Sequence, residues 1–233
     1  MPEILVYIVA VSAGMAFVGL SLATLVTSRV QFWPPPSAGS WQHKTFRGLF
    51  RVFFVGLVVL SLMTFNTDTT SALQYAIGLP LFVVGFGLAV HWTRSLGWRN
   101  AFGEATGLKT DGAYRWSRNP IYVVSIVGMI GWCVVVSNVW VASLLVLWGL
   151  FYGLAPFLEE PWLERQYGDA FRPYQSHVPR FFNPYNYRLS QHRQFVPGAV
   201  HYRRVVERSP TLSKGLVLAS FARKHFGAFK TFV

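Results

Sequence analysis

Long apolar windows constrain this chain more than any other feature of its sequence. The five windows span residues 4–27, 48–65, 73–92, 121–137 and 139–158. Apart from Arg51, they contain no charged residue. A helix needs about 20 such residues to cross a hydrocarbon core of roughly 30 Å. Since 52% of the chain is hydrophobic and only 13% is charged, the sequence predicts an all-α integral membrane bundle of about five transmembrane helices.

Two of the windows require tilt or snorkelling to span a membrane. The second carries Arg51 near its start, and the fourth is short.

Only Ser137 and Asn138 separate the fourth and fifth windows, so the pattern predicts a tight helical hairpin. The first window follows a leader without a basic residue, which favours a retained helix over a secretory signal. Glycines in the third window predict close helix packing.

The net charge of +12 is distributed unevenly along the chain. Lysine and arginine gather between the first and second windows, between the third and fourth, and after the fifth. This alternation predicts an external N-terminus and a cytoplasmic C-terminus. Anionic lipid headgroups, rather than nucleic acid, are the expected partners of these charges. Residues 185–233 are predicted to form a basic cytoplasmic tail, either as an interfacial helix or as a disordered segment.

A polar stretch, residues 108–122 (LKTDGAYRWSRNPIY), leads directly into the fourth window. Asn119 is predicted to cap the helix, and Pro120 suits the first helical position because its missing N–H would have no partner there. With Arg118 alongside, this helix start is a candidate site for a carboxylate or phosphate. The alternative is a positively charged topological anchor with an ordinary cap.

A second polar stretch, residues 157–184, begins with Glu159 and Glu160 at the predicted membrane boundary. Carboxylates there are costly without cations and are functional candidates, although local arginines could simply neutralise them. The helical hairpin is predicted to bring these glutamates to Arg118 across one cytoplasmic pocket. Such a pocket offers donors for a carboxylate and acceptors for an ammonium group or ribose hydroxyls. S-adenosylmethionine fits that polarity.

Both stretches resemble a known superfamily. GAYRWSRNPIY is similar to a motif of the isoprenylcysteine carboxyl methyltransferases and phospholipid methyltransferases, and EEPWLERQYGDAFRPYQSHVPRF resembles their paired-glutamate segment. The resemblance implies an integral membrane methyltransferase domain over residues 1–184. Its implied cofactor is S-adenosylmethionine, bound from the cytoplasm. The implied methyl acceptor is lipophilic and comes from the bilayer: a small molecule, a lipid or a prenyl-cysteine.

The resemblance also assigns roles to particular residues. Those implied to bind the cofactor are Gly112, Tyr114, Arg118, Asn119, Pro120, Tyr122, Glu159 and Glu160. Asn119 stands where the isoprenylcysteine enzymes usually have histidine, which argues against a prenyl-cysteine acceptor. Glu160 and Arg180 are the catalytic candidates. Arg180 would position a carboxylate acceptor, one of the glutamates would deprotonate an amine, and a basic pocket would stabilise a thiolate.

Two other functions are compatible with the same pattern. A membrane-embedded sterol-type reductase would use NADPH, and a non-enzymatic scaffold would use the charges only to neutralise one another. No cluster of residues has metal-ligand spacing, so no metal is predicted. Cys133 is the single cysteine, which rules out an intramolecular disulfide. The proline-rich stretch FWPPPSAGS, residues 32–40, is interpreted only as a connection between helices.

Overall fold

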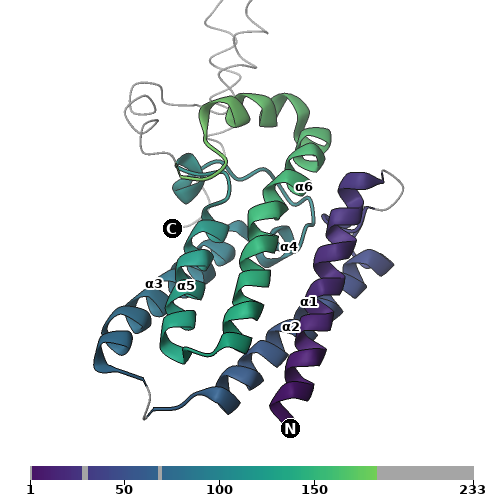
Figure 1. The fold of residues 1–233 in the computed structure, drawn as a ribbon. Helices are drawn as coiled ribbons and strands as arrows, with labels where there is room; N and C mark the ends of the chain where they lie inside the picture. The colour runs from purple at the N-terminus through teal and green to yellow at the C-terminus, as the bar shows by residue number, and fades with distance from the viewer. Residues whose placement is uncertain (1, 28–30, 68–69, 183–233) are drawn as a thin grey trace, which may run out of the picture. The chain divides into compact units, whose positions relative to one another are not determined.

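The computed structural model describes residues 2–27, 31–67 and 70–182, and all regular secondary structure in these ranges is helical (Figure 1). The elements are α1 (Pro2–Val26), α2 (Trp41–Thr64), α3 (Ala72–Leu96), α4 (Trp98–Ala101), the 3₁₀ helix η1 (Gly112–Arg115), α5 (Pro120–Val136) and α6 (Val139–His177). The predicted all-α class is confirmed. The tail predicted at residues 185–233 lies outside the described residues.

Four of these helices, α1, α2, α3 and α6, are long and apolar enough to cross a membrane. The remaining apolar helix, α5, has 17 residues and corresponds to the short fourth window. Three boundaries differ from the prediction by four residues or more, and one of them is the end of α3, at Leu96 rather than residue 92. Helix α2 begins at Trp41, before its apolar window, because Ser40 caps it by accepting a hydrogen bond from the His43 amide. Helix α6 continues far beyond Leu158, to His177.

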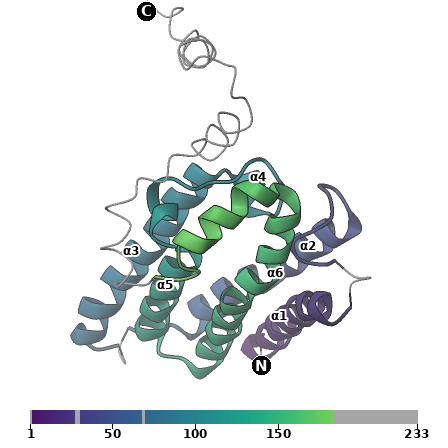
Figure 2. The same cartoon turned by 90° about the horizontal axis from the view of Figure 1, so that it is seen from above.

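The extension of α6 carries the paired-glutamate segment, which the sequence placed after the last span. Three prolines lie within α6, and at Gly168 the backbone leaves helical geometry with φ 42° and ψ −113°. Beyond this residue the helix turns across the end of the bundle (Figures 1 and 2). The kink therefore folds the last part of α6 over the region where the connections preceding α2 and α5 meet.

The predicted hairpin between α5 and α6 is confirmed. Ser137 adopts a left-handed conformation with φ 47°, and its hydroxyl accepts a 2.6 Å hydrogen bond from the Gln74 side chain. The Asn138 side chain caps α6 by accepting from the amides of Trp140 and Val141. These local bonds close the chain reversal within two residues, so the start of α5 and the upper part of α6 lie side by side (Figure 1).

Helices α3 and α5 pack so closely that side chains are excluded at their crossing. A Cβ on Gly85 would lie 2.3 Å from the Gly128 nitrogen, and one on Gly131 would lie 2.3 Å from the Phe82 nitrogen. Backbone atoms cannot move aside as a flexible side chain can. The predicted role of glycines in close packing is confirmed at Gly85, whereas a Cβ on Gly87 would meet no atom within 4 Å.

We expect Gly131→Ala to lower the free energy of unfolding by about 1–3 kcal/mol, because the added methyl overpacks the helix crossing. The measurement is thermal or denaturant unfolding of the detergent-purified protein. Gly87→Ala is the matched control, and it is expected to be neutral or slightly stabilising, since alanine is the better helix former. Equal stability of the two variants would contradict the packing observed here.

An aromatic core joins the remaining helices. α6 contacts both α1 and α5, and α1 packs along α2 (Figure 2). Phe17 of α1, Phe53 of α2 and Phe151 of α6 are buried, with ring centroids 5.1–5.4 Å from Phe17 to each of the other two. These edge-to-face contacts hold the α1–α2 pair against α6. The α1–α2 connection is thereby brought to the same end of the bundle as the glutamates.

Candidate functional site

A cavity of about 270 Å³ opens at this end of the bundle, between α2, α3, α5, α6 and the two connections. Its volume is close to the lower end of the roughly 300–1,000 Å³ typical of small-molecule sites. Six of the predicted site residues line it: Tyr114, Arg118, Asn119, Tyr122, Glu159 and Glu160. Gly112, Pro120 and Arg180 are not among the lining residues. The two motifs therefore meet at one cavity, although three of the predicted residues support it from outside.

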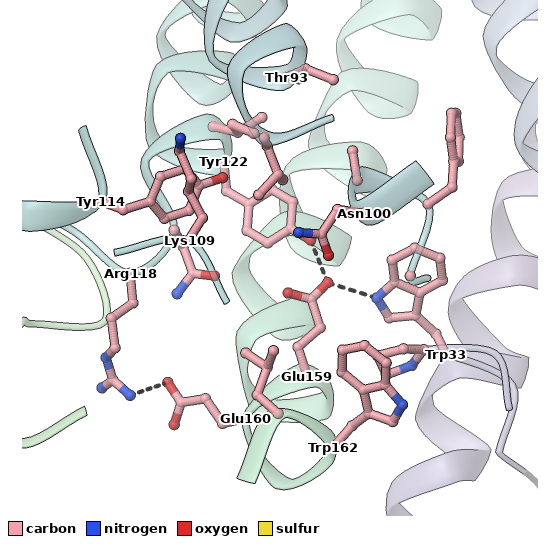
Figure 3. A pocket seen from close by; sticks show the side chains of 18 of the residues that line it. Trp33, Thr93, Asn100, Lys109, Tyr114, Arg118, Tyr122, Glu159, Glu160 and Trp162 are labelled. Atoms are coloured by element: carbon pink, nitrogen blue, oxygen red, sulfur yellow. Dashed lines mark hydrogen bonds and ion pairs between the residues drawn. The ribbon is translucent and has the colours of Figure 1, made fainter. Parts of the chain in front are cut away.

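One of the two carboxylate oxygens of Glu159 is occupied by hydrogen bonds within the protein. Its Oε1 accepts a 2.9 Å hydrogen bond from Trp33 Nε1 and a 2.5 Å hydrogen bond from the Tyr122 hydroxyl. In Figure 3 both donors reach the same oxygen, while the second oxygen points away from them. Both donors are neutral groups. Within the described residues no cation forms an ion pair with Glu159, so its second oxygen is available to a donor group of a ligand.

Glu160, the next residue, is held by arginines instead. Its Oε1 accepts from Arg180 Nε at 2.7 Å, and its Oε2 accepts from Arg180 Nη2 at 2.6 Å. Arg118 Nη1 lies 3.0 Å from the same Oε1. The bidentate hydrogen bond raises the pKa of Arg180 above its ordinary value. Neutralisation by local arginines, one of the two interpretations of the glutamate pair, therefore describes the surroundings of Glu160.

Arg118 retains unused hydrogen-bond donors. Its ion pair with Glu160 is close, but Nη1 is not aligned for a hydrogen bond, and neither Nη1 nor Nε has a hydrogen-bond partner among the described residues. The guanidinium side chain is only 11% exposed. Burial lowers the pKa of Arg118, and the nearby Glu160 carboxylate opposes this shift. The guanidinium remains protonated at neutral pH, because the ordinary pKa of arginine is so high. Buried donors without partners at a cavity wall favour binding of an anionic group.

Asn119 does not cap α5 as predicted. It occupies the N-cap position, but its side chain makes no capping hydrogen bond. Its Nδ2 instead donates to the Arg180 carbonyl at 2.9 Å, and the Ser117 hydroxyl donates to the same carbonyl. The Asn119 side chain therefore bonds to the segment that follows α6 instead of to the first amides of α5. The predicted place of Pro120 at the first helical position is confirmed, since it is the first residue of α5.

The turn before α5 positions Tyr114. Gly112 begins η1 with φ 60°, a left-handed conformation that favours glycine, and it does not line the cavity. The Tyr114 carbonyl accepts a 2.8 Å hydrogen bond from the Tyr174 hydroxyl, which ties η1 to the folded-over end of α6. Burial raises the pKa of Tyr114, so its hydroxyl stays a neutral donor.

The proline-rich connection contributes a residue that sequence analysis missed. Phe32 and Trp33 are 0% and 3% exposed, and Trp33 and Pro34 line the cavity. A Cβ on Gly103 would lie 2.6 Å from Pro35 Cδ, so the segment after α4 packs directly on the prolines. The interpretation of residues 32–40 as only a connection is therefore incomplete. The signal was the Phe-Trp pair itself, since two large aromatic residues before prolines are readily buried.

Further polar residues in the cavity come from the segment between α3 and α5. Asn100 and Lys109 line it, Asn100 Nδ2 donates to the Gly107 carbonyl, and Lys109 pairs with Asp111. Sequence analysis included Lys109 in the polar stretch 108–122 without giving it a role, and it did not single out Asn100. Among the described residues no three histidine, cysteine or carboxylate side chains gather as metal ligands.

The protein is thus an all-α bundle with membrane-spanning helices, and a cavity lined by charged residues lies at one end of the bundle. Residues 73–170 match the family model described as phospholipid methyltransferase. The match runs from α3 into α6 and includes the Asn-Pro motif and both glutamates. It confirms the resemblance to the membrane methyltransferase superfamily, and together with the apolar helices it supports an integral membrane enzyme. The comparisons find no matching curated protein and no matching solved structure.

Proposed function

We propose that this protein transfers a methyl group from S-adenosylmethionine to a lipophilic acceptor that reaches the cavity from the bilayer. The observation that carries the proposal is the pairing of complementary charges at one cavity. Glu159 offers a carboxylate oxygen without a cationic partner, and Arg118 offers buried donors without hydrogen-bond partners. An amino-acid moiety carries the matching ammonium and carboxylate groups.

The residues present fit this cofactor. Glu159 would hold its ammonium group or a ribose hydroxyl, and Arg118 would hold its carboxylate. Aromatic side chains of the cavity, among them Phe46, Phe151 and Tyr152, offer apolar walls for the base and for a lipophilic acceptor. When bound, the cofactor supplies an electrophilic methyl group. The protein contributes orientation and exclusion of water, which require neither a covalent intermediate nor a metal.

The geometry bears on the three acceptor chemistries left open by the sequence. Arg180 is engaged by Glu160 and lies over the Phe157 ring, with 4.1 Å from its guanidinium carbon to the ring centroid, outside the cavity wall. This supports a positioning role for Arg180 through Glu160 more than direct contact with a carboxylate acceptor. An amine acceptor would need a base: both oxygens of Glu160 accept hydrogen bonds from Arg180, and the free oxygen of Glu159 could serve only if it does not hold the cofactor's ammonium group.

We further propose that the cavity faces the cytoplasm and that the N-terminus is external. The basic connections before α2 and α5 lie at the cavity end of the bundle, where anionic lipid headgroups would attract them (Figure 1). A reporter fused after Val233 is expected to be cytoplasmic, and one inserted at residues 66–70 is expected to be external. Location of both reporters on the same side would contradict this topology.

The direct test is calorimetry on the detergent-purified protein with S-adenosylmethionine and, separately, with NADPH. We expect S-adenosylmethionine to bind and NADPH not to bind. Binding of NADPH alone would favour the reductase alternative. Binding of neither ligand by a protein that unfolds cooperatively would favour the scaffold alternative, in which the charges only neutralise one another.

A further inference from the structure

We infer that Trp33, on the connection between α1 and α2, is a positioning residue that orients Glu159 toward the ligand. Trp33 lies outside residues 73–170, the segment that matches the family model. Its indole Nε1 donates a 2.9 Å hydrogen bond to Glu159 Oε1 across 126 residues of sequence. The consequence for ligand affinity rests on the proposed function, whereas the hydrogen bond itself does not.

Two donors on one oxygen fix the rotation of the carboxylate. Trp33 approaches Glu159 Oε1 from the α1–α2 connection, and Tyr122 approaches it from α5 (Figure 3). With Oε1 occupied twice, rotation of the carboxylate would break two hydrogen bonds in a buried site. The second oxygen is therefore held facing the cavity. Without the indole N–H, only Tyr122 would restrain this group.

The indole ring is itself immobilised, as a positioning residue must be. It stacks on Phe46 of α2 with centroids 4.2 Å apart and lies edge-on to Phe151 of α6 at 6.2 Å. The adjacent backbone is held as well, because the Phe32 amide donates to the Thr24 hydroxyl at 3.0 Å. The α1–α2 hairpin thus carries one wall of the cavity and a donor to Glu159, in addition to anchoring the chain in the membrane.

The hydrogen bond is tested first without any ligand. NMR spectra are recorded on full-length protein with labelled indole nitrogens, in which the Trp33 resonance is assigned as the one lost in Trp33→Phe. We expect this resonance to shift in Glu159→Gln, because the charge on its acceptor is removed. Glu164→Gln, which changes an exposed glutamate away from the cavity, is expected to leave it in place. An unchanged chemical shift of the Trp33 indole resonance in Glu159→Gln would overturn the proposal.

A double-mutant cycle then tests the positioning role. Trp33→Phe keeps the aromatic stack and removes the N–H, and we expect it to weaken S-adenosylmethionine binding about tenfold. In a Glu159→Ala background, where the indole N–H has no acceptor at this position, the same change is expected to have less than about a twofold effect, because the residue acts through Glu159. Trp41→Phe is the control, since Trp41 is 58% exposed and does not line the cavity. Equal effects of Trp33→Phe in both backgrounds would assign Trp33 a purely structural role.

Failure of this inference and failure of the proposed function are distinguishable. Wild-type protein that binds no S-adenosylmethionine would reject the proposed function, and the NMR comparison would still decide whether Trp33 holds Glu159. Normal binding by Trp33→Phe would reject the positioning role and leave the proposed function intact.

Discussion

Glu159→Gln is expected to weaken S-adenosylmethionine binding by about 30-fold or more, which corresponds to roughly 2 kcal/mol. Glutamine has nearly the same shape and can still accept from Trp33 and Tyr122, so the cavity should remain intact. What is lost is the one cavity carboxylate that pairs with no arginine or lysine among the described residues. A ligand ammonium group would then meet a neutral amide in a largely desolvated site.

Calorimetric affinity of purified wild-type and variant proteins measures this effect. Glu164→Gln is the matched control, because Glu164 lies on the same helix but pairs with the exposed Arg172 outside the cavity. Wild-type affinity in Glu159→Gln would show that the carboxylate does not contact the ligand. The cavity would then need another group to complement an ammonium ion.

Glu160→Gln is expected to act mainly on stability, with a loss of about 3–5 kcal/mol in the free energy of unfolding. The side chains of Glu160 and Arg118 are only 10% and 11% exposed, so removal of the carboxylate leaves a buried cation uncompensated. Arg180 would lose its bidentate partner at the same time. The segment after α6, which also bonds to Asn119 through the Arg180 carbonyl, should loosen as a result.

Thermal unfolding in detergent, followed by tryptophan fluorescence or circular dichroism, is the measurement for this variant. Glu164→Gln again serves as the control, and a change below about 1 kcal/mol is expected because Arg172 is 64% exposed and its pair is screened by solvent. If Glu160→Gln kept wild-type stability but lost ligand binding, Glu160 would contact the cofactor directly. The cofactor-binding and catalytic roles predicted for it from the sequence would then be favoured over the structural role.

The two adjacent glutamates show where sequence reasoning stops. Consecutive residues on a helix point about 100° apart, so Glu159 and Glu160 must face different surroundings. The sequence identified the pair as a functional candidate and supplied both possible interpretations, ligand binding and neutralisation by arginines. It contained no information on which interpretation applied to which residue. That distinction depends on Trp33, Tyr122, Arg118 and Arg180, which approach from separate parts of the chain.

Local patterns in the sequence determined the all-α class, the apolar helices, the α5–α6 hairpin and the meeting of the two motifs. Each follows from hydrophobic length, turn residues or helix-start residues within a short stretch, so no distant contact is needed to predict it. The tertiary structure alone decided that Trp33 reaches Glu159 across 126 residues and that Asn119 bonds to the Arg180 carbonyl instead of capping α5. These contacts arise because aromatic packing brings the α1–α2 hairpin against α6, and because the kink at Gly168 folds the end of α6 over the cavity. The Phe32-Trp33 pair predicts its own burial, but no pattern within either segment specifies the residue that it contacts.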